Sequence, residues 1–177
     1  MRTKKDGFIH SLSILLLFLF CQNLYSQNWG MSIGGSTEKV VFGDVFYKKA
    51  LHYFHAGLSY QISDAKGEEK SERLSNYGLS TSGSGDKFYT MDLGYGCQII
   101  DTLEVFLEVS IGQKKNYTNY TDNRFKDGGY HMINKSEIIT GFGVGGSYSI
   151  NKQFKIFASF NTIRKLGIGI RYMFNHY

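Results

Sequence analysis

The side chains of this sequence that could do chemistry are charged and polar residues set two apart in short alternating segments. They are Asp92, Gln98, Glu104, Glu108, Lys155, Arg171 and His55. Acidic and basic groups enclosed on one narrow face should pair, because an isolated buried charge is very costly. The pattern therefore predicts a hydrogen-bonded plug near the axis of the fold. The alternative is a gate in which Glu104 or Glu108 exchanges between Lys155 and Arg171.

Other chemistries have little support. Beyond the N-terminal leader the histidines are His52, His55, His131 and His176, and their spacing does not group them with a serine and a carboxylate as a hydrolase would require. No metal-ligand spacing occurs, and glycines at every second position indicate a strand, not a phosphate-binding loop. We therefore expect no catalytic residue, no metal site and no cofactor.

Alternation of period two runs along most of the chain and would position the polar set. In residues 103–112 the odd positions are aliphatic, whereas the even positions are mostly polar or small. Such alternation predicts half-buried β-strands. Eight segments qualify, of which the second alternates most weakly: 29–34, 40–47, 53–62, 88–100, 103–112, 138–150, 154–161 and 166–174.

The lengths of the connections indicate how these strands are joined. Asp101-Thr102 and Asn151-Lys152 are very short turns, whereas residues 64–87 and 113–136 read as long polar loops. With eight strands, the short turns and both chain ends fall on the same side. This is the layout of an all-β, eight-stranded antiparallel up-and-down transmembrane β-barrel.

Glycine decides which face of the strands points inward. The polar rows carry eleven glycines, which make a poor solvent face but relieve crowding inside a narrow cylinder: Gly30, Gly34, Gly57, Gly94, Gly96, Gly112, Gly141, Gly143, Gly145, Gly167 and Gly169. The polar rows should therefore line the interior. The alternative is a soluble barrel of the lipocalin kind, in which the apolar rows would line a ligand cavity.

Aromatic residues support a membrane setting because they cluster at both ends of the apolar rows, as the paired girdles of membrane barrels do. On the short-turn side these are Trp29, Tyr148, Phe154, Tyr172 and Phe174; toward the loops they are Tyr60, Tyr89, Phe142 and Phe160.

The first 26 residues have the pattern of a secretory leader. Arg2, Lys4 and Lys5 precede an apolar run from Ile14 to Cys21 that is too short to cross a bilayer. We expect a signal peptide over 1–26 and a single barrel domain over 27–177. Removing the leader lowers the formal charge from +5 to +3, since three basic residues and Asp6 are lost. The remaining basic residues are scattered, so nucleic acid is not expected as a partner.

The closing segment, Leu166 to Phe174, reads LGIGIRYMF. An exported chain of about eight alternating strands that ends in this way resembles the small OmpA-like and OmpX-like outer-membrane barrels. The resemblance implies location in a bacterial outer membrane, contact with its lipid, and recognition of Leu166 to Phe174 by the barrel-assembly machinery. It departs from the family at the end, because Asn175, His176 and Tyr177 follow Phe174.

The long loops are the features best suited to function, because they mix Tyr, Asn, Lys and Arg in a composition suited to surface contacts. We therefore expect a non-enzymatic barrel with a structural or adhesion role, which presents loops 64–87 and 113–136 to an extracellular ligand. A lipid-modifying enzyme or a small gated pore on the same scaffold is the first alternative. A soluble exported binder of apolar ligands is the second.

Overall fold

The computed structural model describes residues 29–73, 80–125 and 128–174, so the leader expected over 1–26 lies outside the described residues. The described residues form nine strands: β1 (Trp29–Ser36), β2 (Val40–Lys49), β3 (His52–Gln61), β4 (Glu68–Lys70), β5 (Thr81–Ile100), β6 (Leu103–Thr121), β7 (Gly129–Ser149), β8 (Phe154–Asn161) and β9 (Lys165–Met173). Within these ranges no helix is long and apolar enough to span a membrane.

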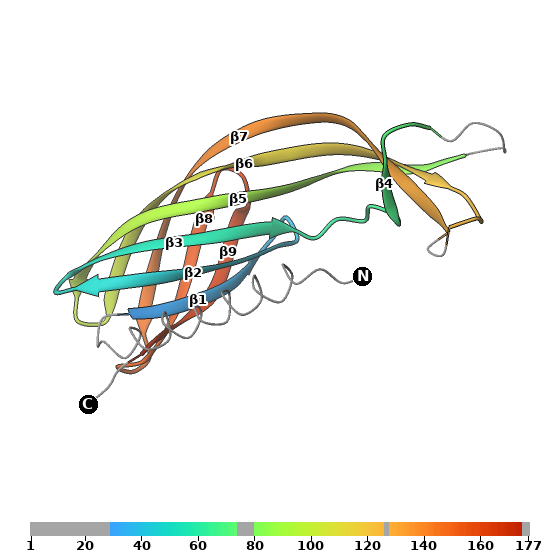
Figure 1. Cartoon of the computed structure of the whole chain (residues 1–177). Coiled ribbons are helices and arrows are strands. Elements are labelled where there is room, and N and C mark those ends of the chain that lie inside the picture. Colours follow the sequence, from blue (N-terminus) through green and yellow to red (C-terminus); the bar gives the residue numbers. More distant parts are fainter. Residues whose placement is uncertain (1–28, 74–79, 126–127, 175–177) are drawn as a thin grey trace, which may run out of the picture.

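Eight of these strands close into a barrel (Figure 1). Their order is β7-β6-β5-β3-β2-β1-β9-β8, and β8 pairs back with β7. Every pairing within the barrel is antiparallel, while the short β4 lies outside it, parallel to β7. Closure leaves no free edge along the cylinder, which satisfies the backbone polar groups as a lipid environment requires. The predicted eight-stranded up-and-down barrel is confirmed.

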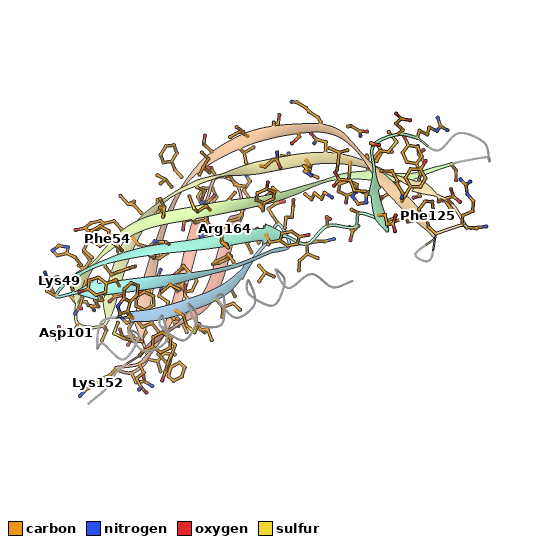
Figure 2. The ribbon with its side chains drawn as sticks, in the orientation of Figure 1. Lys49, Phe54, Asp101, Phe125, Lys152 and Arg164 are labelled. Carbon is orange, nitrogen blue, oxygen red and sulfur yellow. The ribbon has the colours of Figure 1, made fainter. Side chains whose placement is uncertain are left out.

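The two faces of the barrel have opposite polarity. Phe142 and Ile168 on the outer face are 70% and 73% exposed, whereas Glu104 and Arg171 on the inner face are buried. Figure 2 shows Phe54 projecting outward from the barrel wall. An apolar outer band around a polar interior is the arrangement of a transmembrane barrel. The soluble alternative, with apolar rows lining a cavity, is therefore wrong.

The weakly alternating second strand is β2, and its side chains explain the weak pattern. Val40, Phe42 and Phe46 are buried inside the barrel, while Val41 and Val45 are each 45% exposed on the outer face. Both rows are apolar because aromatic rings from β2 fill the interior. The expected polar interior is therefore a mixture of aromatic rings and charged groups.

Large interior side chains lie over glycines of adjacent strands. A Cβ atom on Gly34 would lie 2.6 Å from the Phe42 ring, and one on Gly169 would lie 2.6 Å from the Phe157 ring. Gly94 faces the His55 ring in the same way. The glycines of the polar rows thus provide the space that each ring or charged chain occupies.

Three strands extend far beyond the barrel wall. β5, β6 and β7 contain 20, 19 and 21 residues, whereas the other barrel strands contain 8 to 10. Together with β4 they form a four-stranded sheet that projects from one end (Figure 1), which we call the protruding sheet: residues 68–70, 81–88, 113–121 and 129–137. β1 begins and β9 finishes at the opposite end of the barrel.

The prediction of loops over 64–87 and 113–136 was therefore wrong for much of both segments. Residues 81–87, 113–121 and 129–136 continue the strands, with a bulge between Asn116 and Tyr117. These segments lie beyond the exposed apolar band of the barrel and carry no continuous apolar row of their own. Strand detection by hydrophobic alternation fails where the apolar row ends.

Two adjacent glycines of β1 test how strongly the interior is crowded. Gly34→Ala should lower the free energy of unfolding by about 1–3 kcal/mol, the usual cost of overpacking, because its Cβ would press on Phe42. Gly35→Ala is the matched control, since its Cβ would come no closer than 3.7 Å to a neighbouring atom. Urea titrations followed by gel migration without boiling measure both. Equal stability of the two variants would contradict the proposed crowding.

Candidate functional site

The interior near the short-turn end is organised around Glu104. Its carboxylate accepts hydrogen bonds from Lys155 and, at 2.8 Å, from Lys48. Ser147 Oγ donates to the second carboxylate oxygen at 3.0 Å, and Lys48 also donates to Gln98 Oε1 at 2.7 Å. Two ammonium groups therefore share one carboxylate, and the Gln98 amide oxygen accepts a further hydrogen bond from Lys48.

Arg171 occupies the next level and is surrounded by aromatic rings. Its Cζ lies 4.5 Å from the ring centre of Phe106, 4.9 Å from that of Tyr53 and 5.0 Å from that of Phe157. Its Nη1 donates to the Tyr53 hydroxyl at 2.6 Å. Within the described part of the chain no carboxylate lies at ion-pair distance from this guanidinium. Cation–π contacts replace an anionic partner here.

A third group lies toward the protruding sheet, at the mouth of the barrel. Arg164, in the turn between β8 and β9, points back into the barrel and lies 3.0 Å from Asp92 Oδ2 and 2.7 Å from the Glu108 carboxylate. Figure 2 labels Arg164 close to this end. Ser59 also donates to Asp92, and Asn161 Nδ2 donates to Glu108 at 2.7 Å. Two buried carboxylates here share one cation.

All seven residues expected in the interior point into it, but they form separate groups. Glu104, Gln98 and Lys155 belong to one group, and Asp92 and Glu108 belong to another. Arg171 lies among the rings. His55 lies 3.8 Å from Asp44 Oδ2, and neither of its ring nitrogens has a hydrogen-bond partner. The geometry does not place Glu104 or Glu108 between Lys155 and Arg171, as the gate hypothesis required.

The sequence reasoning missed two cations that hold these groups together. Arg164 falls in a turn, outside every alternating row, so its pattern carries no sign that it points inward. Lys48 continues the even-numbered inward row of β2, after Phe42 and Phe46. Extending that row by one more position would have identified Lys48.

The second functional region is the protruding sheet, around whose edge residues 62–73 wrap. On one face, Lys66 N donates to Asn119 Oδ1 at 2.9 Å, and His131 Nδ1 lies 2.8 Å from Lys66 O. β4 then pairs along the outer edge of β7. On the other face, Lys70 and Arg73 lie over aromatic rings, those of Phe125 and Tyr120.

The protruding sheet has a small buried core of its own. Tyr117, Tyr130 and His131 are at most 5% exposed, and the Tyr120 and Tyr130 rings stack with centres 5.3 Å apart. Burial of this kind gives the sheet a defined shape beyond the barrel wall. The structure therefore offers an ordered surface where unstructured loops were expected.

A polar groove lies between the mouth of the barrel and this sheet. Its volume is about 490 Å³, within the range of small-molecule sites. The groove is lined by residues 37–39, 61–64 and 82–86, with Tyr117 and Asn119. Among the described residues, no cluster of three or more His, Cys, Asp or Glu side chains could hold a metal ion.

Comparison with known proteins adds a set of distant structural likenesses. No protein-family model and no curated protein matches the sequence. Neisserial surface protein A is 12% identical, with a TM-score of 0.46, and the alignment covers 83% of this chain and 94% of that one. The N-terminal barrel domain of Pseudomonas aeruginosa OprF is 12% identical, with a TM-score of 0.45, and the alignment covers 82% of this chain and 96% of that one. Ail of Yersinia pestis is 11% identical, with a TM-score of 0.43, and the alignment covers 81% of this chain and 89% of that one.

These TM-scores are all below 0.5, so the fold assignment rests on the strand pairing and burial of this chain itself. The pairing closes eight strands, and the burial places polar groups inside and apolar groups outside. The chain has the fold of a small eight-stranded transmembrane β-barrel.

Arg164 should be a strong determinant of barrel stability. Arg164→Gln leaves Asp92 and Glu108 buried without a cation, so we expect a loss of about 3–5 kcal/mol in the free energy of unfolding. Adding Asp92→Asn and Glu108→Gln removes the unpaired charges and should restore part of that loss. Urea unfolding of the two variants measures the effect. A triple variant no more stable than the single one would show that charge pairing is not the cause.

Proposed function

We propose that this chain is a non-enzymatic barrel of the bacterial outer membrane that acts through its protruding sheet. The barrel anchors the sheet in the lipid, and the sheet presents a defined surface outside the cell for adhesion or for contacts within the envelope. The observation that carries the proposal is the contrast between the two regions. The described interior is filled by aromatic rings and by charges that have ionic or ring partners, whereas the sheet extends three strands well past the apolar band.

Several features support an anchoring role for the barrel. Its outer band is apolar all around, and Phe154 and Tyr172 form an aromatic pair, with ring centres 4.9 Å apart, where β8 begins and β9 ends. Aromatic pairs of this kind suit the interface between lipid and water. Assembly through the final strand, Leu166 to Phe174, belongs to the same proposal.

The features outside the membrane favour recognition. The sheet carries Tyr, Asn and Lys side chains on an ordered backbone, and such rigid polar and aromatic surfaces lose little conformational entropy on binding. The polar groove of about 490 Å³ beside it offers an open recess for part of a ligand.

Removing the protruding sheet tests this role directly. A trimmed chain in which residues 63–86 and 115–136 are each replaced by a short Asn-Gly turn should keep the barrel, because its interior groups lie below the cuts. We expect this chain to retain the heat-dependent shift in gel migration, while attachment of expressing cells to one another and to protein-coated surfaces falls to the level of cells lacking the protein. Unchanged attachment would refute the proposed role.

The orientation can be tested separately with single cysteines in a Cys97→Ala background. Ser84→Cys lies exposed on the protruding sheet, and Asp101→Cys lies in the turn between β5 and β6 at the other end, where Figure 2 labels Asp101. A membrane-impermeant maleimide should label Ser84→Cys on intact cells. It should label Asp101→Cys only after the outer membrane is permeabilised. The reverse pattern would place the sheet in the periplasm.

A further inference from the structure

Side chains from all four strands of the protruding sheet meet at one carboxylate. Glu69 of β4 lies 3.3 Å from Lys87 Nζ of β5 and 3.4 Å from Lys115 Nζ of β6. His131 of β7 lies 3.9 Å from the same carboxylate, and its Nε2 lies 2.8 Å from Lys87 Nζ. Lys87 and Lys115 are paired in register across β5 and β6 and therefore share a face.

Both ring nitrogens of His131 have a contact. A backbone carbonyl can only accept a hydrogen bond, so the 2.8 Å contact with Lys66 O places a proton on Nδ1. Nε2 then accepts from the Lys87 ammonium. His131 thus contacts Lys87 directly, and Glu69 is the only anion in contact with the two lysines among the described residues.

Lys87, Lys115 and Glu69 together carry an excess of positive charge, whereas neighbouring lysines of the sheet are paired one to one with carboxylates. Lys70, Lys114 and Lys135 of the same sheet each pair with a carboxylate of their own, those of Glu68, Asp86 and Glu137. Lys87 and Lys115 share one. Partial burial would raise the pKa of Glu69, but hydrogen bonds and charges from Lys87 and Lys115 outweigh it and hold that pKa below its ordinary value. Glu69 is therefore ionised at neutral pH.

The carboxylate is held weakly. β4 contributes three residues, and the Glu69 side chain is 45% exposed. Ion pairs of this exposure contribute little free energy. A phosphate group carries more negative charge and more acceptor oxygens than one carboxylate, so it can satisfy both lysines at once.

The position of the lysines along the strands indicates where such a phosphate would come from. Tyr89 and Gln113 are joined by a 2.8 Å hydrogen bond at the loop-side end of the apolar band, and Lys87 and Lys115 each lie two residues further on. Two strand residues span about 7 Å. The polar headgroup layer on each side of the hydrocarbon core is about as thick. The two ammonium groups therefore stand at the level of lipid headgroups.

We propose that Lys87 and Lys115, oriented in part by His131, form a binding site for a phosphate group, and that Glu69 occupies this site until the phosphate displaces it. The natural source is a phosphorylated headgroup of the outer leaflet, with a free phosphate compound as the other source of the same chemistry. Only the choice of an outer-leaflet headgroup as the source rests on the proposed placement of the sheet outside the cell; the phosphate site itself does not.

Binding to the full chain in micelles of dodecyl maltoside, a detergent without phosphate, tests the site, with pyrophosphate as the probe and calorimetry as the readout. Glu69→Gln should tighten pyrophosphate binding about fivefold, as expected when a competing surface ion pair is removed. Lys87→Gln with Lys115→Gln should abolish binding. Lys114→Gln with Lys135→Gln is the matched control, because it removes the same charge from the same sheet, and it should leave the affinity unchanged.

A second arm identifies the source by co-purification of lipid A or of its dephosphorylated form with each variant. If the unmodified protein retains lipid A but not its dephosphorylated form, and the Lys87 and Lys115 double variant retains neither, the result supports a headgroup ligand. Pyrophosphate binding without retention of lipid A supports a free phosphate. The proposal is overturned if the double variant binds as the control does, or if Glu69→Gln weakens binding. These purified-protein results stand whichever way the maleimide and attachment experiments turn out.

Discussion

The interior of a closed eight-stranded cylinder is so narrow that every inward side chain must be fitted against the strand beside it, and the rest of the structure depends on this constraint. Phe42, Phe157 and His55 fit because Gly34, Gly169 and Gly94 face them. Charges fit only where they share a counter-ion or lie against aromatic rings. Crowding and charge pairing are therefore linked, since each cation must reach its partners through the space that glycine leaves.

The barrel itself was predictable from sequence because lipid imposes a strict rule on its outer face. Residues such as Leu107, Ile168 and Phe142 must be apolar at every second position, and that periodicity identifies the strands. The rule weakens on β2, where Phe42 and Phe46 make the inner row apolar too, and it ends at the membrane surface. Beyond that level β5, β6 and β7 are held together by backbone hydrogen bonds, which place little restriction on residue type.

The interior groups were predictable in membership but not in pairing. Alternation placed Glu104, Glu108, Lys155 and Arg171 on the inner face, because position along a strand determines the face. It could not show that Arg171 lies among rings or that Arg164 returns from a turn to join Asp92 and Glu108. Partners across a barrel depend on the stagger of strands far apart in sequence, and no local pattern encodes that stagger.

The pairing of the first strand with the last has a consequence for how the molecule is made. β5, β6 and β7 form consecutive hairpins whose contacts are local in the chain, so their sheet can begin to form early. β1 meets β9 only after the intervening chain has been arranged, as in the pair Ser32 and Arg171. Closure is therefore the step with the greatest loop entropy, and folding speed should depend on the terminal strands more than on the sheet that projects from the barrel.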